Sequence, residues 1–298
     1  DADGWFSDTG AAQALANYMG ESIVYPYENA LTVTASNGVM KMTSATGSYA
    51  TLALSGSFSL KFYNKSGTLV SEVTDISISG GKTVLSGSLT GGEGIFGGGE
   101  RFDSSNHRGK RMLMYSNDGW NNTNSTYMPI PVFSTTRGGG VYVNRYEQMT
   151  FDWGKTSANT WSVTLNKETM DCYFYATEKI PEVLQAYTDL TGNAEMPDEW
   201  YQGVIVCRYG PDFSVTYTKD ETLTTNKDGA PAGRSFQTII ESFEKAGLPT
   251  PKAVITEGWG YGGVIVSQKA RDRLQEAIDY LHGKGIKLML YMRVASTI

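Results

Sequence analysis

The chain has 298 residues, of which 40% are hydrophobic and 19% charged, and 31 acidic against 25 basic side chains give a net charge of −6. This length and apolar content suffice for two domains with buried cores. The acidic balance argues against a nucleic-acid-binding protein, which needs a basic face. No apolar run reaches the roughly 20 residues of a membrane-spanning helix.

The composition offers little for a metal site or a disulfide framework. Cys172 and Cys207 fit neither a set of disulfides nor a zinc-ligand pattern, and the chain has 2 histidines. We therefore expect no metal and no cofactor. The first residues, DADGWFSD, lack the basic and apolar regions of a signal peptide. A processed secreted protein begins in the same way, and we expect a secreted or cell-surface protein.

Residues 1–178 are predicted to form an antiparallel β-sandwich. A short helix is expected at residues 11–20, and beyond it apolar and polar residues alternate in segments bounded by Gly, Asn and Ser. A period of two with one buried face is typical of antiparallel sheets. The alternating segments are residues 31–36, 50–64, 72–89, 139–153 and 161–166.

The stretch GIFGGGERFD, residues 94–103, has three consecutive glycines before a Glu-Arg pair. It is not a phosphate-binding loop, because that loop ends in Lys-Ser or Lys-Thr and opens a helix. Here Glu100 follows the glycines, and its carboxylate would repel phosphate. The following residues lack the apolar helical period that a dinucleotide site requires. The glycines therefore predict sharp turns or a close approach of another group.

From residue 179 onward the pattern changes to helices and continuously apolar strands. The first helix ends at Gly192, and its apolar face consists of Ile180, Val183, Leu184, Tyr187 and Leu190. Further on, strands are expected at 203–208, 253–257 and 287–292, with helices at 235–247 and 267–282. This alternation predicts a parallel α/β unit. Because three strands do not close a barrel and the pattern stops at Ile298, we expect the N-terminal portion of a longer protein.

Three segments in order carry a resemblance to a known family. They are FGGGERFDSSNHRGK, YMPIPVFSTTRGGGVYVN and PEVLQAYTDLTGNAEMPDEW. From Gly94 to about Met292 the chain resembles glycoside hydrolase family 31, the α-glucosidase and α-xylosidase family. The resemblance implies a β-sandwich followed by a (β/α)8 TIM-type barrel, of which residues 179–298 are the linker helix and the first β/α units.

The resemblance also implies a retaining mechanism on α-linked glucosides or related oligosaccharides. One Asp attacks the anomeric carbon and a second acts as acid and then base, with carboxyl groups about 5–5.5 Å apart. Both lie on later strands, beyond residue 298. We therefore expect no catalytic residue in this chain, no activity from the chain alone, and partners consisting of an α-glycoside or oligosaccharide substrate and the remainder of its own barrel.

Substrate-binding candidates follow the predicted parallel strands. The second strand leads into TEGWGYGG, where familiar α-glucosidases have Asp-x-Asp. Glu257 is expected to replace the first Asp in gripping a sugar hydroxyl, and Trp259 to stack on the ring. This departure puts a plain glucose specificity in doubt. Arg208 and Arg293, at the ends of strands one and three, are further candidates, although arginine there serves equally well as an ion-pair partner.

The sandwich supplies two more candidates. The loop YSNDGWNNTNSTY resembles a family loop that reaches the rim of the active site, which implies that Asp118 and Trp120 contact a leaving-group sugar. A solvated Asn-rich loop is the alternative. Glu100 and Arg101 are expected to hold the junction between sandwich and barrel by charge-assisted hydrogen bonds, with direct sugar contact as the alternative.

Other functions stay open at this stage. An α-transglycosylase or a non-glucose α-glycosidase would have the same motifs. A non-catalytic carbohydrate-binding protein would not need the parallel strands, and a structural surface protein would not need the family motifs.

Overall fold

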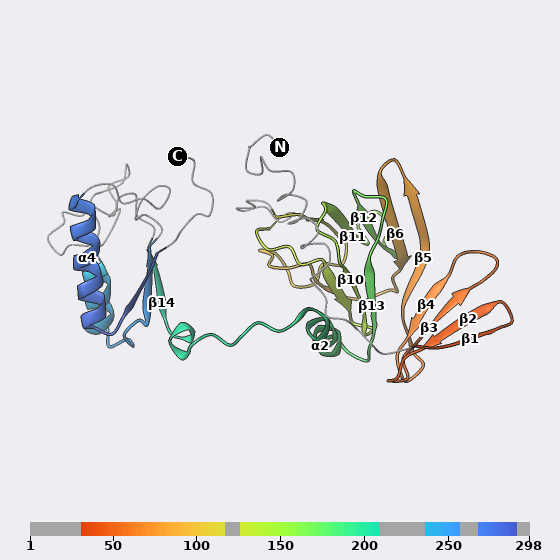
Figure 1. The fold of residues 1–298 in the computed structure, drawn as a ribbon, viewed down its shortest axis with the longest axis horizontal. Helices are drawn as coiled ribbons and strands as arrows, with labels where there is room; N and C mark the ends of the chain where they lie inside the picture. Colours follow the sequence, from red (N-terminus) through yellow and green to blue (C-terminus); the bar gives the residue numbers. More distant parts are fainter. Residues whose placement is uncertain (1–30, 117–125, 209–235, 257–267, 291–298) are drawn as a thin grey trace, which may run out of the picture. The chain divides into compact units, whose positions relative to one another are not determined.

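The computed structural model describes residues 31–116, 126–208, 236–256 and 268–290. The helix expected at residues 11–20 lies outside them. The chain divides into two compact units, residues 1–193 and 194–298 (Figure 1).

The first unit contains two antiparallel sheets, as the period-two segments predicted. The larger has the order β1-β2-β3-β4-β5-β6-β12-β11-β8 and the smaller β13-β10-β9-β7. Strands of the larger sheet are β1 (Thr32–Ser36), β2 (Val39–Thr43), β3 (Tyr49–Ala53), β4 (Leu60–Tyr63), β5 (Leu69–Ser79), β6 (Lys82–Ser88), β8 (Lys110–Met114), β11 (Met149–Trp153) and β12 (Thr160–Leu165). Those of the smaller are β7 (Ile95–Gly97), β9 (Val132–Thr135), β10 (Gly139–Val143) and β13 (Cys172–Ala176).

The core of this sandwich is built on aromatic rings. Phe133 of β9 contacts Phe151, Trp153 and Trp161 edge-on, with ring centroids 5.5–5.7 Å apart. Burying one such side chain contributes about 1.5–3 kcal/mol. The space for Trp161 comes from Gly87 on β6, where an added Cβ would lie 2.3 Å from the indole. The register of β6 and β12 thus places the large Trp161 ring opposite a residue without a side chain.

Helix α2 (Ile180–Thr191) packs on the smaller sheet, beside β10 and β13 (Figure 1). Pro181 lies in its first turn, where its missing N–H is not needed. At the other end the Gly192 N–H donates to the Thr188 carbonyl at 2.8 Å. Val183 and Leu190 are buried, but Leu184 is 61% exposed. The prediction that Leu184 belongs to the buried face was therefore wrong, because the contact stripe is narrower than the apolar stripe.

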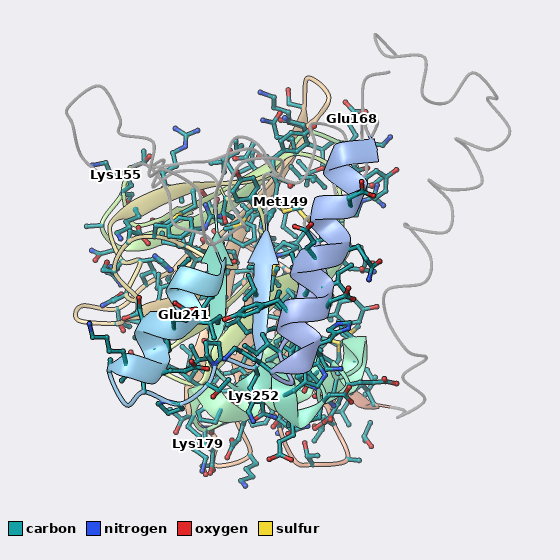
Figure 2. All side chains as sticks on the ribbon, turned by 90° about the vertical axis from the view of Figure 1, so that its left-hand side faces the viewer. Met149, Lys155, Glu168, Lys179, Glu241 and Lys252 are labelled. Atoms are coloured by element: carbon teal, nitrogen blue, oxygen red, sulfur yellow. The ribbon has the colours of Figure 1, made fainter. Side chains whose placement is uncertain are left out.

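The second unit contains a parallel sheet with the order β14-β15-β16, as the apolar strands predicted. Its elements are the 3-10 helix η1 (Glu199–Gln202), β14 (Ile205–Arg208), α3 (Phe236–Lys245), β15 (Ala253–Thr256), α4 (Gln268–Gly283) and β16 (Lys287–Leu290). Figure 2 shows α3, which carries Glu241, and α4 side by side in front of the strands. Their contact with the sheet is apolar, through Ile240, Val254, Ala277, Leu281 and Ile286. Within the described ranges, no helix is long and apolar enough to cross a bilayer.

Candidate active site

The carboxyl ends of the parallel strands form the first candidate region. Arg208 pairs with Thr256, and Thr256 pairs with Leu290, so the last residues of the three strands lie in one row. Ligands of parallel β/α folds bind at this edge of the sheet. Arg208 ends β14, as predicted.

The side chains predicted for this edge are not among those described. Glu257 directly follows β15 in the sequence, and Trp259 comes two residues later. Both lie outside the described residues, as does Arg293, and the side chain of Arg208 is not described either. The register therefore places Arg208 in the row of strand ends, while the positions of Glu257, Trp259 and Arg293 and the contacts of all four side chains stay predictions.

The glycine loop of the sandwich is the second region. Gly97, Gly98 and Gly99 all have positive φ angles, of 121°, 83° and 88°, which side chains other than glycine rarely allow. An added Cβ would lie 2.4 Å from the Val132 carbonyl oxygen at Gly97, and 2.0 Å from that of Met128 at Gly99. The group that approaches Gly97 and Gly99 is therefore the backbone near residues 128–132, whereas Gly98 faces the side chains of Trp153 and Met114.

Arg101 fastens this loop to strand β8. Its guanidinium donates to the carbonyls of Gly98, at 3.1 Å, and of Leu113, at 3.0 Å. Burial lowers the pKa of Arg101, and Asp103 opposes that shift. Glu100 is exposed, and its backbone N–H donates to the Met128 carbonyl at 3.1 Å. These bonds lie within the sandwich, so the role of Glu100 and Arg101 at a junction with the barrel stays a prediction.

A second set of charged residues lies in the same loop, and we call it the Asp103 cluster: Asp103, His107 and Lys110. Lys110 Nζ is 2.5 Å from Asp103 Oδ2, and His107 Nδ1 is 3.7 Å from Asp103 Oδ1. The His107 ring stacks on Trp153 with centroids 5.4 Å apart. Sequence reasoning missed this cluster, although the spacing of the three residues in FDSSNHRGK was a usable signal.

The loop that carries Asp118 and Trp120 lies outside the described residues, but its two ends are described. Ser116 and Thr126 form a β-bridge, and Ser116 Oγ donates to the Tyr127 carbonyl at 2.9 Å. The two ends of the loop therefore meet. Tyr127 is 56% exposed beside them, which leaves an aromatic ring at the base of the loop.

No metal centre accompanies these regions in the part of the chain that the structure describes. No group of three or more His, Cys, Asp or Glu side chains there could hold a metal ion. Burial raises the pKa of the Cys172 thiol to about 12, so Cys172 is a packing residue at neutral pH.

Comparison with protein families identifies the sandwich. Residues 22–152 match the glycosyl hydrolase 31 N-terminal galactose mutarotase-like domain. Residues 22–152 are thus similar to the N-terminal domain of glycoside hydrolase family 31. The resemblance of its motifs to that family is thereby confirmed, and the glycine loop, the Asp103 cluster and the loop of residues 117–125 all fall within the matched range.

Curated proteins that are similar to this chain are named as α-glycosidases. An α-glucosidase from Saccharolobus solfataricus is 29% identical over 136 residues, covering 44% of this chain and 20% of that enzyme. An α-xylosidase from Emericella nidulans is 28% identical over 150 residues, covering 50% of this chain and 19% of that enzyme. The chain therefore spans about a fifth of the length of these curated relatives.

Solved structures of family 31 enzymes share the fold. The GH31 dextranase of Flavobacterium johnsoniae, complexed with isomaltotriose, has a TM-score of 0.70 and 21% identity, covering 88% of this chain and 31% of its own. The cycloalternan-forming enzyme from Listeria monocytogenes, complexed with a pentasaccharide substrate, has a TM-score of 0.69 and 16% identity, covering 94% of this chain and 28% of its own. At such identities the likeness concerns the fold alone.

Proposed function

We propose that the complete protein is a retaining α-glycosidase of family 31 that acts on α-linked glucosides or related oligosaccharides. The observation that carries this proposal is the match of residues 22–152 to the family's N-terminal domain. The parallel unit β14-α3-β15-α4-β16 has the element order of the first part of a (β/α)8 barrel, which supports the same assignment for residues 179–298.

The reaction proceeds by double displacement in this proposal. An aspartate displaces the leaving group to form a glycosyl-enzyme, and a second carboxyl group protonates the leaving oxygen and then activates water. Both groups lie beyond residue 298. The residues of this chain bind and orient the sugar: Glu257 accepts hydroxyl hydrogen bonds and Trp259 stacks on the ring, with Arg208 and Arg293 at the same edge of the sheet.

Asp118 and Trp120 are proposed to bind the leaving-group sugar. Their loop falls within the range matched to the family, and the described residues at its ends are held together by the bridge of Ser116 and Thr126. A loop whose ends are held together beside an exposed aromatic ring, Tyr127, is suited to a sugar, because the flat face of a pyranose packs on a ring.

A non-glucose specificity is the second candidate. The sequence TEGWGYGG departs from the Asp-x-Asp of familiar α-glucosidases, and the relatives include α-xylosidases. Transfer to a second sugar instead of water is a variant of the same chemistry.

The proposal predicts that the 298-residue chain alone has no glycosidase activity. The test is to assay the purified chain and the complete protein on aryl α-glucoside and aryl α-xyloside. Turnover by the complete protein alone is expected. If the short chain turns over substrate and an alanine substitution within residues 1–298 abolishes that turnover, the assignment of the catalytic residues to positions beyond 298 is wrong.

A further inference from the structure

One of the 2 histidines of the protein is buried in the loop between β7 and β8. His107 is 4% exposed. Its backbone N–H donates to the Ile95 carbonyl at 2.8 Å, and its carbonyl accepts from the Lys110 N–H at 3.0 Å. The ring lies against the indole of Trp153, which is fully buried. The imidazole is therefore largely shielded from water, with 5% of the side chain exposed.

Three polar atoms around this ring are buried without a hydrogen-bond partner among the residues that the structure describes. They are His107 Nδ1, Asp103 Oδ1 and Trp153 Nε1. The 3.7 Å between His107 Nδ1 and Asp103 Oδ1 is too long for a hydrogen bond. Buried polar atoms in proteins are nearly always paired, and the exceptions call for an explanation. Two of these three atoms, on His107 and Asp103, belong to groups that titrate.

The charges that face His107 among the described residues come from its own loop and from the start of β8. Asp103 and Arg101 lie in the loop and Lys110 is the first residue of β8, so that one anion stands beside two cations. From β7 the ring faces the Gly97 carbonyl, and from β11 it faces Trp153, neither of which titrates. A proton on His107 would therefore be the third positive charge around a single carboxylate, and Lys110 already occupies one oxygen of that carboxylate at 2.5 Å.

We propose that His107 is an acid-sensitive latch that holds the loop of residues 98–110 against the sandwich when neutral and releases it when protonated. Protonation turns both ring nitrogens into donors. Asp103 must then approach Nδ1, which weakens its contact with Lys110, and the buried imidazolium draws the loop toward water. This device does not depend on the proposed glycosidase activity.

Release of the loop of residues 98–110 would also affect the segment around Met128. Glu100 lies in the same loop and donates its N–H to the Met128 carbonyl. Met128 follows the bridge between Ser116 and Thr126. A loosened loop therefore changes the support at the base of residues 117–125.

The direction of the pH dependence follows from burial. Burial is the main cause that lowers the pKa of His107 below its ordinary value of 6.5, Asp103 raises it, and Lys110 and Arg101 lower it. The released or unfolded loop thus binds the proton more tightly than the closed loop. The stability that the latch contributes is fully present above pH 6.5 and is lost as the pH falls through the lowered pKa.

The presence of only 2 histidines makes the test direct. The imidazole signals of the native chain and of the urea-denatured chain are followed by NMR between pH 7.5 and 5, together with the amide signals of Gly98, Glu100 and Met128. His107→Gln and His282→Gln assign the two signals. His282 is exposed on α4, so His282→Gln is the matched control.

The expected result is a His107 midpoint below that of the denatured chain, with the three amide signals shifting at the same midpoint. His107→Gln removes this shift and His282→Gln leaves it unchanged. Asp103→Asn, which removes the carboxylate, should lower the His107 midpoint further. A His107 midpoint at or above that of the denatured chain would overturn the proposal, and so would amide signals that do not shift as His107 titrates. Both outcomes are read from the wild-type protein, so the test holds even where a variant fails to fold.

Discussion

Replacing Gly99 with alanine should destabilise the sandwich far more than the same change at Gly109 in the same loop. Both residues have positive φ angles, 88° and 78°, and this conformation costs a residue with a Cβ about 1–2 kcal/mol. At Gly109 nothing lies within 4 Å of an added Cβ. At Gly99 the Cβ would meet the Met128 carbonyl oxygen at 2.0 Å and the Ile130 nitrogen at 2.6 Å.

The difference between the two variants can be estimated from these contacts. Because backbone atoms cannot rotate away, Gly99→Ala must push the loop from the strand and break the hydrogen bond from the Glu100 N–H to Met128, which contributes about 0.5–1.5 kcal/mol. We expect a loss of about 3 kcal/mol for Gly99→Ala and about 1 kcal/mol for Gly109→Ala. For a unit of this size, 1 kcal/mol corresponds to about 2–4 °C in melting temperature.

The assay is thermal and urea unfolding followed by tryptophan fluorescence, since Trp153 and Trp161 are buried in the core of the sandwich. The expected loss in melting temperature is about 6–12 °C for Gly99→Ala and about 2–4 °C for Gly109→Ala. Equal losses in the two variants would refute the reasoning, because the close approach of residues 128–132 would then contribute nothing.

Further predictions concern helix α2 and the proposed sugar site. Gly140→Ala should lower the stability of the sandwich by about 1–3 kcal/mol, because its Cβ would lie 2.5 Å from Val183 Cγ1. Urea unfolding measures the loss, with Leu184→Ala on the exposed side of α2 as the control. Unchanged stability of Gly140→Ala would contradict the prediction. In the complete enzyme, Glu257→Gln should lower kcat/KM about ten- to a hundredfold, since a charge-assisted hydrogen bond contributes about 1.5–3 kcal/mol; a lower melting temperature with unchanged kinetics would instead indicate an ion pair. Trp259→Ala should mainly raise KM, because stacking is the same in ground and transition states, and an effect on kcat alone would contradict stacking.

The sequence predicted burial best in strands whose alternate residues face the core. The alternation in 161–166 predicted β12, whose residues Trp161, Val163 and Leu165 are buried while their neighbours are partly exposed. In β1 the same alternation is present, yet all five residues are exposed. β1 lies at one edge of the larger sheet. The alternation predicts which side chains share a face of the strand, but it does not predict whether another element packs on that face. The burial of Leu184 on α2 was mispredicted for the same reason: it belongs to the apolar stripe of the helix, but no described element covers it.

The candidate site was less accessible to sequence reasoning. The glycines of residues 97–99 indicated a close approach. The group that approaches Gly99 is the backbone near Met128, which lies about 30 residues away in the sequence and is brought there by the pairing of β7 with β9. The burial of His107 could not be read from FDSSNHRGK, because it depends on Trp153 from another strand. Contacts between distant segments have no local signature in a single sequence.

The most direct test of the central claim is to trap the glycosyl-enzyme of the complete protein. A 2-fluoro-α-glycosyl fluoride slows hydrolysis of the covalent intermediate, and mass spectrometry of the digested protein locates the sugar. The account predicts one labelled aspartate, in a peptide beyond residue 298, and no label on residues 1–298. A label within residues 1–298, or turnover with inverted anomeric configuration and no label at all, would contradict it.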